Sequence, residues 1–102
     1  MTLIGTTEEF KQECSYPLSI HNKSVLLIHQ QQKYYLIENK CGHFGIALND
    51  ATIKDEQIIC SQHAISFSLN SGQVVNRPYE NCDSIKIFKL EKVNDDLYSP
   101  DL

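Results

Sequence analysis

The sequence predicts an all-β fold, a sandwich or a barrel, built as one domain over residues 1–102. Three observations support this prediction. Apolar, β-branched and aromatic residues gather in short runs, turn residues interrupt them roughly every eight to twelve positions, and only one short stretch has helical character. The length suits a single domain, and a hydrophobic fraction of 41% allows a modest core.

The first half of the chain contains four strand-like runs separated by polar turns. These runs are residues 2–6, 16–20, 25–30 and 33–38. Residues 21–24 and 31–32 are the expected turns, and the last run is rich in the aromatic and β-branched types that strands favour.

Residues 25–30 begin with four apolar side chains, at positions 25–28, and are expected to form a strand. Alternate side chains of a strand point to opposite faces. Val25, Leu27 and His29 should therefore share one face, and Leu26, Ile28 and Gln30 the other.

The second half also consists of short strand-like runs. These are residues 57–60, 66–75, 84–93 and 97–99. A turn is expected at residues 70–72, inside the second run, and another at residues 94–96. The one helical candidate is residues 6–13, one or two turns with Thr6 or Thr7 as N-cap.

The charge pattern argues against nucleic acid and membrane as partners. The net charge is −4, the pI is near 5.4, and the nine basic residues form no stripe that could neutralise phosphates. No secretory signal peptide and no run of about 18 apolar residues is present. We therefore expect a cytoplasmic protein, in which patterned cysteines and histidines point to metal binding or catalysis and not to disulfides.

Two Cys-His pairs stand out. One residue separates Cys41 from His43, and sixteen residues later Cys60 begins a second pair with His63. Both pairs follow strand-like runs, so a strand pair can bring their loops to one end of a sheet. Such a set can hold zinc, but zinc fingers usually group like ligands together. One Cys and one His from each loop suit two irons, as in a Rieske [2Fe-2S] centre.

The residues around the pairs resemble the Rieske family, whose signature is C-x-H, about fifteen to seventeen residues, then C-x-x-H. The segment "CGHFGIAL" is similar to the family's CPHxGxxL, and "IICSQHAISFSLNSG" is similar to IxCPxHGxxFDLxTG. The resemblance covers roughly residues 24–98. On these motifs the chain is identified as a Rieske-type [2Fe-2S] ferredoxin of the low-potential kind that serves Rieske non-haem iron oxygenase systems.

The resemblance implies a Rieske-type antiparallel β-sandwich with a small cluster-binding subdomain of two loops, at about residues 41–48 and 60–67. It implies one [2Fe-2S] cluster per chain and no catalytic residue. The implied ligands are Cys41, His43, Cys60 and His63. The family places its histidine ligands near the surface, so a partner is expected to dock over them.

The resemblance also implies a function: a soluble, monomeric one-electron carrier that is not itself an enzyme. It would take electrons from an NAD(P)H-dependent flavin reductase and pass them to a terminal oxygenase or reductase. One alternative is the small Rieske-like subunit of a nitrite reductase. An alternative of another class is a zinc-stabilised interaction module, which would lack the colour and the rhombic EPR signal of a reduced cluster.

High-potential members of the family carry two extra cysteines and two hydroxyl groups near the cluster. Ile46 and Gln62 stand at the cysteine positions here, and Ile65 and Phe67 stand at the hydroxyl positions. Hydrogen bonds to sulfur stabilise the reduced cluster, so their absence lowers the potential. We expect a midpoint at the low end of the family range, on the order of −150 mV.

Three flanking residues depart from the family pattern. Gly42 and Ser61 replace prolines, and Ala64 replaces a glycine. Ala64 cannot adopt a positive φ cheaply, so the second loop is strained or differently shaped if that position needs one.

Three further residues have weaker signals. Arg77 falls where the family has a proline loop over the cluster, and it either orients a partner or is a solvated loop charge. Cys14 and Cys82 have no neighbouring ligand partners, and we expect both to be buried free thiols.

Overall fold

The computed structural model describes residues 2–40, 48–49, 51–60, 65–75 and 84–102 of the chain. Within these residues it contains ten strands in three antiparallel sheets and one short 3-10 helix. The predicted all-β fold is confirmed. None of the helical structure in this part of the chain is long and apolar enough to cross a membrane.

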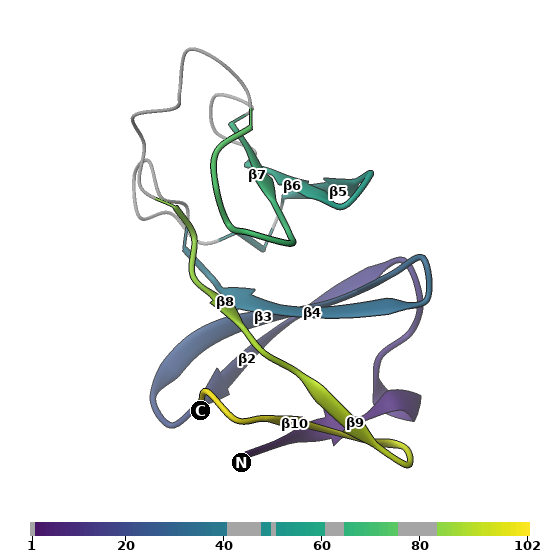
Figure 1. Ribbon diagram of the computed structural model, residues 1–102. Helices are drawn as coiled ribbons and strands as arrows, with labels where there is room; N and C mark the ends of the chain where they lie inside the picture. Colours follow the sequence, from purple (N-terminus) through teal and green to yellow (C-terminus); the bar gives the residue numbers. More distant parts are fainter. Residues whose placement is uncertain (1, 41–47, 50, 61–64, 76–83) are drawn as a thin grey trace.

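The three sheets form successive layers (Figure 1). The central sheet has the order β2 (Cys14–Ile20), β3 (Lys23–Gln30), β4 (Lys33–Glu38), β8 (Ile87–Phe88). The outer sheet has the order β1 (Thr2–Thr6), β10 (Asp96–Ser99), β9 (Glu91–Val93). The small sheet, on the opposite side of the central sheet, has the order β5 (Thr52–Lys54), β6 (Gln57–Ile59), β7 (Ser66–Ser68).

A separate hydrophobic cluster packs on each face of the central sheet. The framework core comprises Phe10, Val25, Leu27, Leu36, Phe88 and Leu97. The loop-side core comprises Leu26, Ile28, Ile37, Leu48, Ile58, Cys60, Ile65, Phe67, Leu69 and Ile85. Successive residues of β3 therefore alternate between the two cores, as their spacing predicts. Burial on both faces explains why four apolar residues follow one another in this strand.

Three hairpins turn through residue pairs with positive φ. The pairs are His21 with Asn22, Gln31 with Gln32, and Asp55 with Glu56, with φ between 52° and 65°. Two consecutive residues with positive φ suit a two-residue hairpin because this turn matches the right-handed twist of the strands. The predicted turns at 21–24 and 31–32 are confirmed, although β3 already begins at Lys23.

Two strand predictions need correction. Residues 84–93 do not form one strand, because β8 joins the central sheet whereas β9 joins the outer sheet. Between them the backbone N–H of Lys89 donates to the Asp101 carboxylate at 2.7 Å, which holds the crossing chain against the C-terminal segment. Strand β5 was not predicted, since three residues with one central isoleucine give too little alternation to be recognised.

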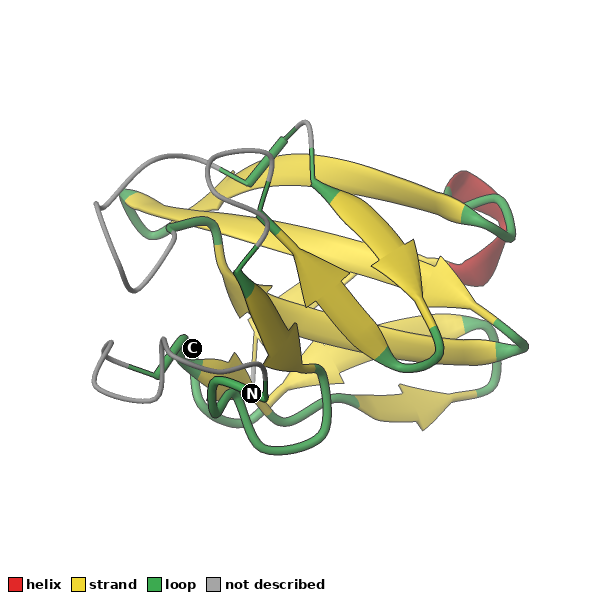
Figure 2. Cartoon of the chain, turned by 90° about the horizontal axis from the view of Figure 1, so that it is seen from above, coloured by secondary structure: helices red, strands yellow, loops and turns green. Residues whose placement is uncertain are grey.

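The predicted helix is shorter than expected. It is a 3-10 helix over Thr7–Glu9, with Thr6 as its N-cap. The Glu9 carboxylate accepts a hydrogen bond from the Thr6 backbone N–H at 2.8 Å. Figure 2 shows this turn in red, at the end of the molecule away from both chain termini. Phe10 follows the turn and enters the framework core, which ends the helix after one turn.

Candidate metal centre

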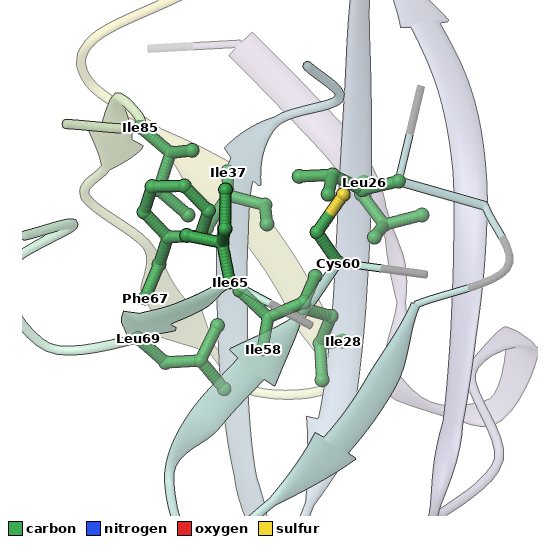
Figure 3. Packing of buried hydrophobic residues seen from close by; sticks show 10 residues of the cluster. Leu26, Ile28, Ile37, Ile58, Cys60, Ile65, Phe67, Leu69 and Ile85 are labelled. Atoms are coloured by element: carbon green, nitrogen blue, oxygen red, sulfur yellow. The ribbon is translucent and has the colours of Figure 1, made fainter. Parts of the chain in front are cut away.

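Of the four predicted ligands, only Cys60 lies among the described residues. It directly follows β6, is 2% exposed and belongs to the loop-side core. Figure 3 shows its sulfur directed toward Leu26. The other residues that the sequence analysis singled out near the motifs lie outside the described residues: Cys41, Gly42, His43, Ile46, Ser61, Gln62, His63, Ala64, Arg77 and Cys82.

Asn39 holds together the two ends of the segment that contains the first Cys-His pair. Its side-chain oxygen accepts a hydrogen bond from the Leu48 backbone N–H at 2.6 Å, and its Nδ2 donates to Asn49 Oδ1 at 2.5 Å. Its own backbone N–H donates to the Ser24 carbonyl at 3.0 Å. Asn39 is 7% exposed, so these bonds satisfy buried polar groups and fix the base of the first loop.

Sequence reasoning missed Asn39. A signal was present, because an asparagine directly after an apolar strand and before a motif is typical of side-chain hydrogen bonds that shape a turn. The bond to Leu48 spans nine residues, however, and a contact at that distance along the chain cannot be read from local sequence.

The second loop is closed at its base by the backbone. The Cys60 N–H donates to the Ile65 carbonyl at 2.8 Å. Leu48, which ends the first predicted loop, lies in the same core as Cys60 and Ile65. The described ends of both loops therefore meet on one cluster. The convergence of the four ligand side chains stays a prediction.

Gly72 brings the chain that follows β7 close to Ile85 of the loop-side core. Its φ is +80°, and a Cβ at this position would lie 2.1 Å from the Ile85 carbonyl oxygen. The Gly72 carbonyl accepts a hydrogen bond from the Ile85 N–H at 2.9 Å, and Val75 N–H donates to the Ser66 carbonyl at 2.9 Å. Only glycine combines this backbone conformation with so close an approach.

Glu56 links the small sheet to the central sheet. Its Oε1 accepts hydrogen bonds from Lys33 Nζ at 2.8 Å and from the Tyr35 hydroxyl at 3.4 Å. Its Oε2 accepts from Asn70 Nδ2 at 3.4 Å. The Lys33 hydrogen bond, followed by that from Asn70, lowers the pKa of Glu56 below its usual value. The same bond raises the pKa of Lys33.

The described residues that pack with Cys60 in the loop-side core are apolar. Ile65 and Phe67, the two residues at the family's hydroxyl positions, are 0% exposed and lie in the same core. Buried isoleucine and phenylalanine side chains exclude water and donate no hydrogen bond to a nearby sulfur.

The prediction that Cys14 is buried is wrong. Cys14 is exposed, because it is the first residue of β2, which lies at the edge of the central sheet. No three His, Cys, Asp or Glu residues in the described part of the chain are grouped closely enough to hold a metal ion.

The chain belongs to the Rieske [2Fe-2S] domain family, which matches residues 1–93. Membership of this family implies one [2Fe-2S] cluster. The described residues fit such a group, since they provide one buried thiol at the start of the second loop and bring the ends of both loops to one core. Family membership also favours an iron-sulfur cluster over zinc.

Several solved structures share the fold. The ferredoxin of carbazole 1,9a-dioxygenase from Nocardioides aromaticivorans IC177 has 16% identity and a TM-score of 0.82, over 97% of each chain. The terminal oxygenase of the same dioxygenase has 16% identity and a TM-score of 0.85, over 96% of this chain but 29% of the oxygenase. A chain of a complex of reduced oxygenase and oxidized ferredoxin in carbazole 1,9a-dioxygenase has 15% identity and a TM-score of 0.81, over 95% of this chain and 98% of that chain. None of the curated proteins compared with the chain matches it.

Proposed function

We propose that the protein is a soluble one-electron carrier of a Rieske oxygenase system. It accepts electrons from an NAD(P)H-dependent flavin reductase and delivers them to a terminal oxygenase. The observation that carries this proposal is the match to a dioxygenase ferredoxin over 97% of both chains. The oxygenase, by contrast, is matched over only 29% of its length, so the likeness there is confined to one part of a larger chain.

The cluster would be held by Cys41 and Cys60 through their thiolates and by His43 and His63 through their imidazoles. When bound, it supplies reversible one-electron redox chemistry. Cys60 supports this assignment because it directly follows β6 at the start of the second loop, is buried, and has its backbone N–H bonded to the Ile65 carbonyl. Asn39 supports the first pair, because its hydrogen bond to Leu48 holds both ends of the loop that carries Cys41 and His43.

The apolar residues beside Cys60 support a low potential. Ile65 and Phe67 supply no hydroxyl group, and both side chains are fully buried. A cluster without these hydrogen bonds is harder to reduce, so we propose a midpoint on the order of −150 mV.

The proposal is tested on anaerobically purified protein. We expect a red-brown solution, uptake of one electron per chain in a dithionite titration, and a rhombic EPR signal in the reduced state. A colourless protein that contains zinc would contradict the proposal, and a midpoint above about +100 mV would contradict the low-potential assignment.

The carrier role needs a second measurement, because a cluster alone does not make a carrier. Extract from the source cells, supplied with NADH or NADPH, should reduce the purified protein through a flavoprotein fraction. Failure of every flavoprotein fraction to reduce a fully loaded protein would contradict the proposed electron donor while leaving the cluster assignment intact.

A further inference from the structure

Three lysines gather around an open groove at one end of the central sheet. The groove has a volume of about 390 Å³. It is lined by Lys23 and Ser24 from β3, by residues 38–40 at the end of β4, and by Lys86 and Phe88 in and before β8. These three strands are neighbours in the sheet, so the groove crosses their ends.

The position of the charges follows from strand alternation. Lys23 lies on the same face of β3 as Val25, and Lys86 lies on the same face as Phe88. Val25 and Phe88 belong to the framework core, which the outer sheet covers through Leu97. The same face is thus apolar beneath the outer sheet and becomes positively charged at the strand ends.

The described residues balance the positive charge of the groove only in part. Glu38 is the one carboxylate among the described residues that line it, against the three lysines. None of Lys23, Lys40 and Lys86 forms an ion pair within the described part of the chain. Lys86 Nζ instead lies 5.3 Å from the centroid of the Phe88 ring.

Three of the nine basic residues therefore line one groove, although the net charge of the chain is −4. Like charges at close range repel, and an anionic occupant would relieve that repulsion. The chemistry of the groove thus favours an occupant that carries several negative charges.

The shape of the groove distinguishes a protein segment from a small anion. Strands β3 and β8 flank β4, and neighbouring strands are about 4.8 Å apart, so the lysines arise from positions spread over roughly 10 Å. Lysine is a flexible point charge without the fixed fork that grips one phosphate. Several carboxylates along a chain match this spread better than a single anion does.

We propose that this lysine groove is a docking surface for an acidic segment of a partner protein. Because Lys40 directly precedes Cys41, the docked segment would border the first predicted cluster loop. The proposal does not depend on the electron-carrier function, since the described residues that line the groove lie in and beside the strands of the central sheet.

The test measures binding of a defined probe to the cluster-loaded protein. The probe is an acetylated, amidated hexapeptide with four glutamates, titrated calorimetrically at low ionic strength, and its matched control has four glutamines. The groove variant is Lys23→Gln, Lys40→Gln and Lys86→Gln. The control variant, with the same net charge and exposed lysines elsewhere, is Lys11→Gln, Lys54→Gln and Lys92→Gln.

We expect the acidic peptide to bind and the glutamine peptide not to bind. The groove variant should weaken the Kd about tenfold, the sum expected of three exposed charge pairs, and the control variant less than about twofold. Amide NMR spectra verify that both variants remain folded. Equal weakening by both variants would overturn the proposal, since net charge alone would then explain binding.

Two other results would also overturn it. The first is failure of the acidic peptide to bind the unmodified protein. The second is full displacement of the peptide by an equal concentration of inorganic phosphate, which would identify a small-anion site in place of a protein docking surface.

Discussion

The two faces of the central sheet support regions of different construction. On the framework side, β2, β3 and β4 have seven, eight and six residues, and long ladders of backbone hydrogen bonds fix their register. On the loop side, β5, β6 and β7 have three residues each. A sheet of such short strands gains little from its own ladder and depends on packing against a neighbour.

The small sheet is therefore held by a few specific residues. Gly72 allows a close backbone approach, Glu56 bonds across to β4, and Asn39 closes the base of the first loop. The region that carries Cys60 therefore takes its stability from the central sheet. Changes in this region should affect cluster binding before they unfold the framework.

The largest expected effect is that of Gly72→Ala. The new Cβ would meet a backbone oxygen at 2.1 Å and would also force an L-residue to a φ of +80°. We expect a loss of more than about 3 kcal/mol in the free energy of unfolding, with loss of cluster colour. Urea unfolding followed by circular dichroism and visible absorption measures both.

Gly5→Ala is the matched control in the outer sheet. Its Cβ would meet side-chain atoms of Glu9 and Phe10, which can shift, and its φ is not positive. We expect a cost of about 1–2 kcal/mol and full retention of the cluster at moderate temperature. An equal loss of cluster in both variants would show that the two regions are not distinct.

Leu26→Ala and Leu27→Ala compare the two cores directly. Both leucines are 0% exposed and adjacent in β3, but they face the loop-side core and the framework core respectively. Each substitution should cost about 2–5 kcal/mol. Only Leu26→Ala should release the cluster at a temperature well below global unfolding.

The measurement is a thermal scan at two wavelengths, one for the cluster and one for backbone structure. Coincident transitions in both variants would contradict the proposed independence of the two cores.

Asn39→Ala should have an intermediate effect. It leaves the buried Leu48 N–H without its acceptor, which costs about 1–3 kcal/mol. The base of the first loop should loosen. We expect faster amide hydrogen exchange at Leu48 and a broader EPR signal of the reduced cluster. Asn49→Ala removes only the exposed partner of Asn39, so it serves as the control and should change little.

The smallest effect concerns the pH dependence of Glu56. Its pKa is lower in the folded protein than its ordinary 4.5, mainly because of the Lys33 hydrogen bond. The stabilisation is thus complete above pH 4.5 and is lost as the pH falls through the lowered pKa. Glu56→Gln should show a smaller fall in Tm between pH 7 and pH 3 than the unmodified protein.

The Lys33 and Glu56 side chains are 62% and 36% exposed, so salt screens their ion pair and the change should also shrink in high salt. An identical pH dependence in the two proteins would mean that the bridge does not contribute.

Local sequence determined the elements with a strong pattern. The hairpin β3–β4 was predictable because four apolar residues and an aromatic-rich run flank a polar turn, and the alternation assigned Leu26 and Leu27 to opposite faces. The Cys-His spacing likewise determined the family, because a cluster constrains its ligands at fixed intervals along the chain. The types of residue that can bind iron are few, so such a motif can be recognised in the sequence without knowledge of the fold.

The other features depend on how the sheets pack against one another. The tertiary structure split residues 84–93 between two sheets, exposed Cys14 at a sheet edge, and gave Asn39 and Gly72 their roles at the loop bases. Each depends on a partner distant in the chain, such as Asp101 for Lys89 or Ile85 for Gly72. Short-range propensity cannot specify such partners, because they are brought together only when the sheets pack.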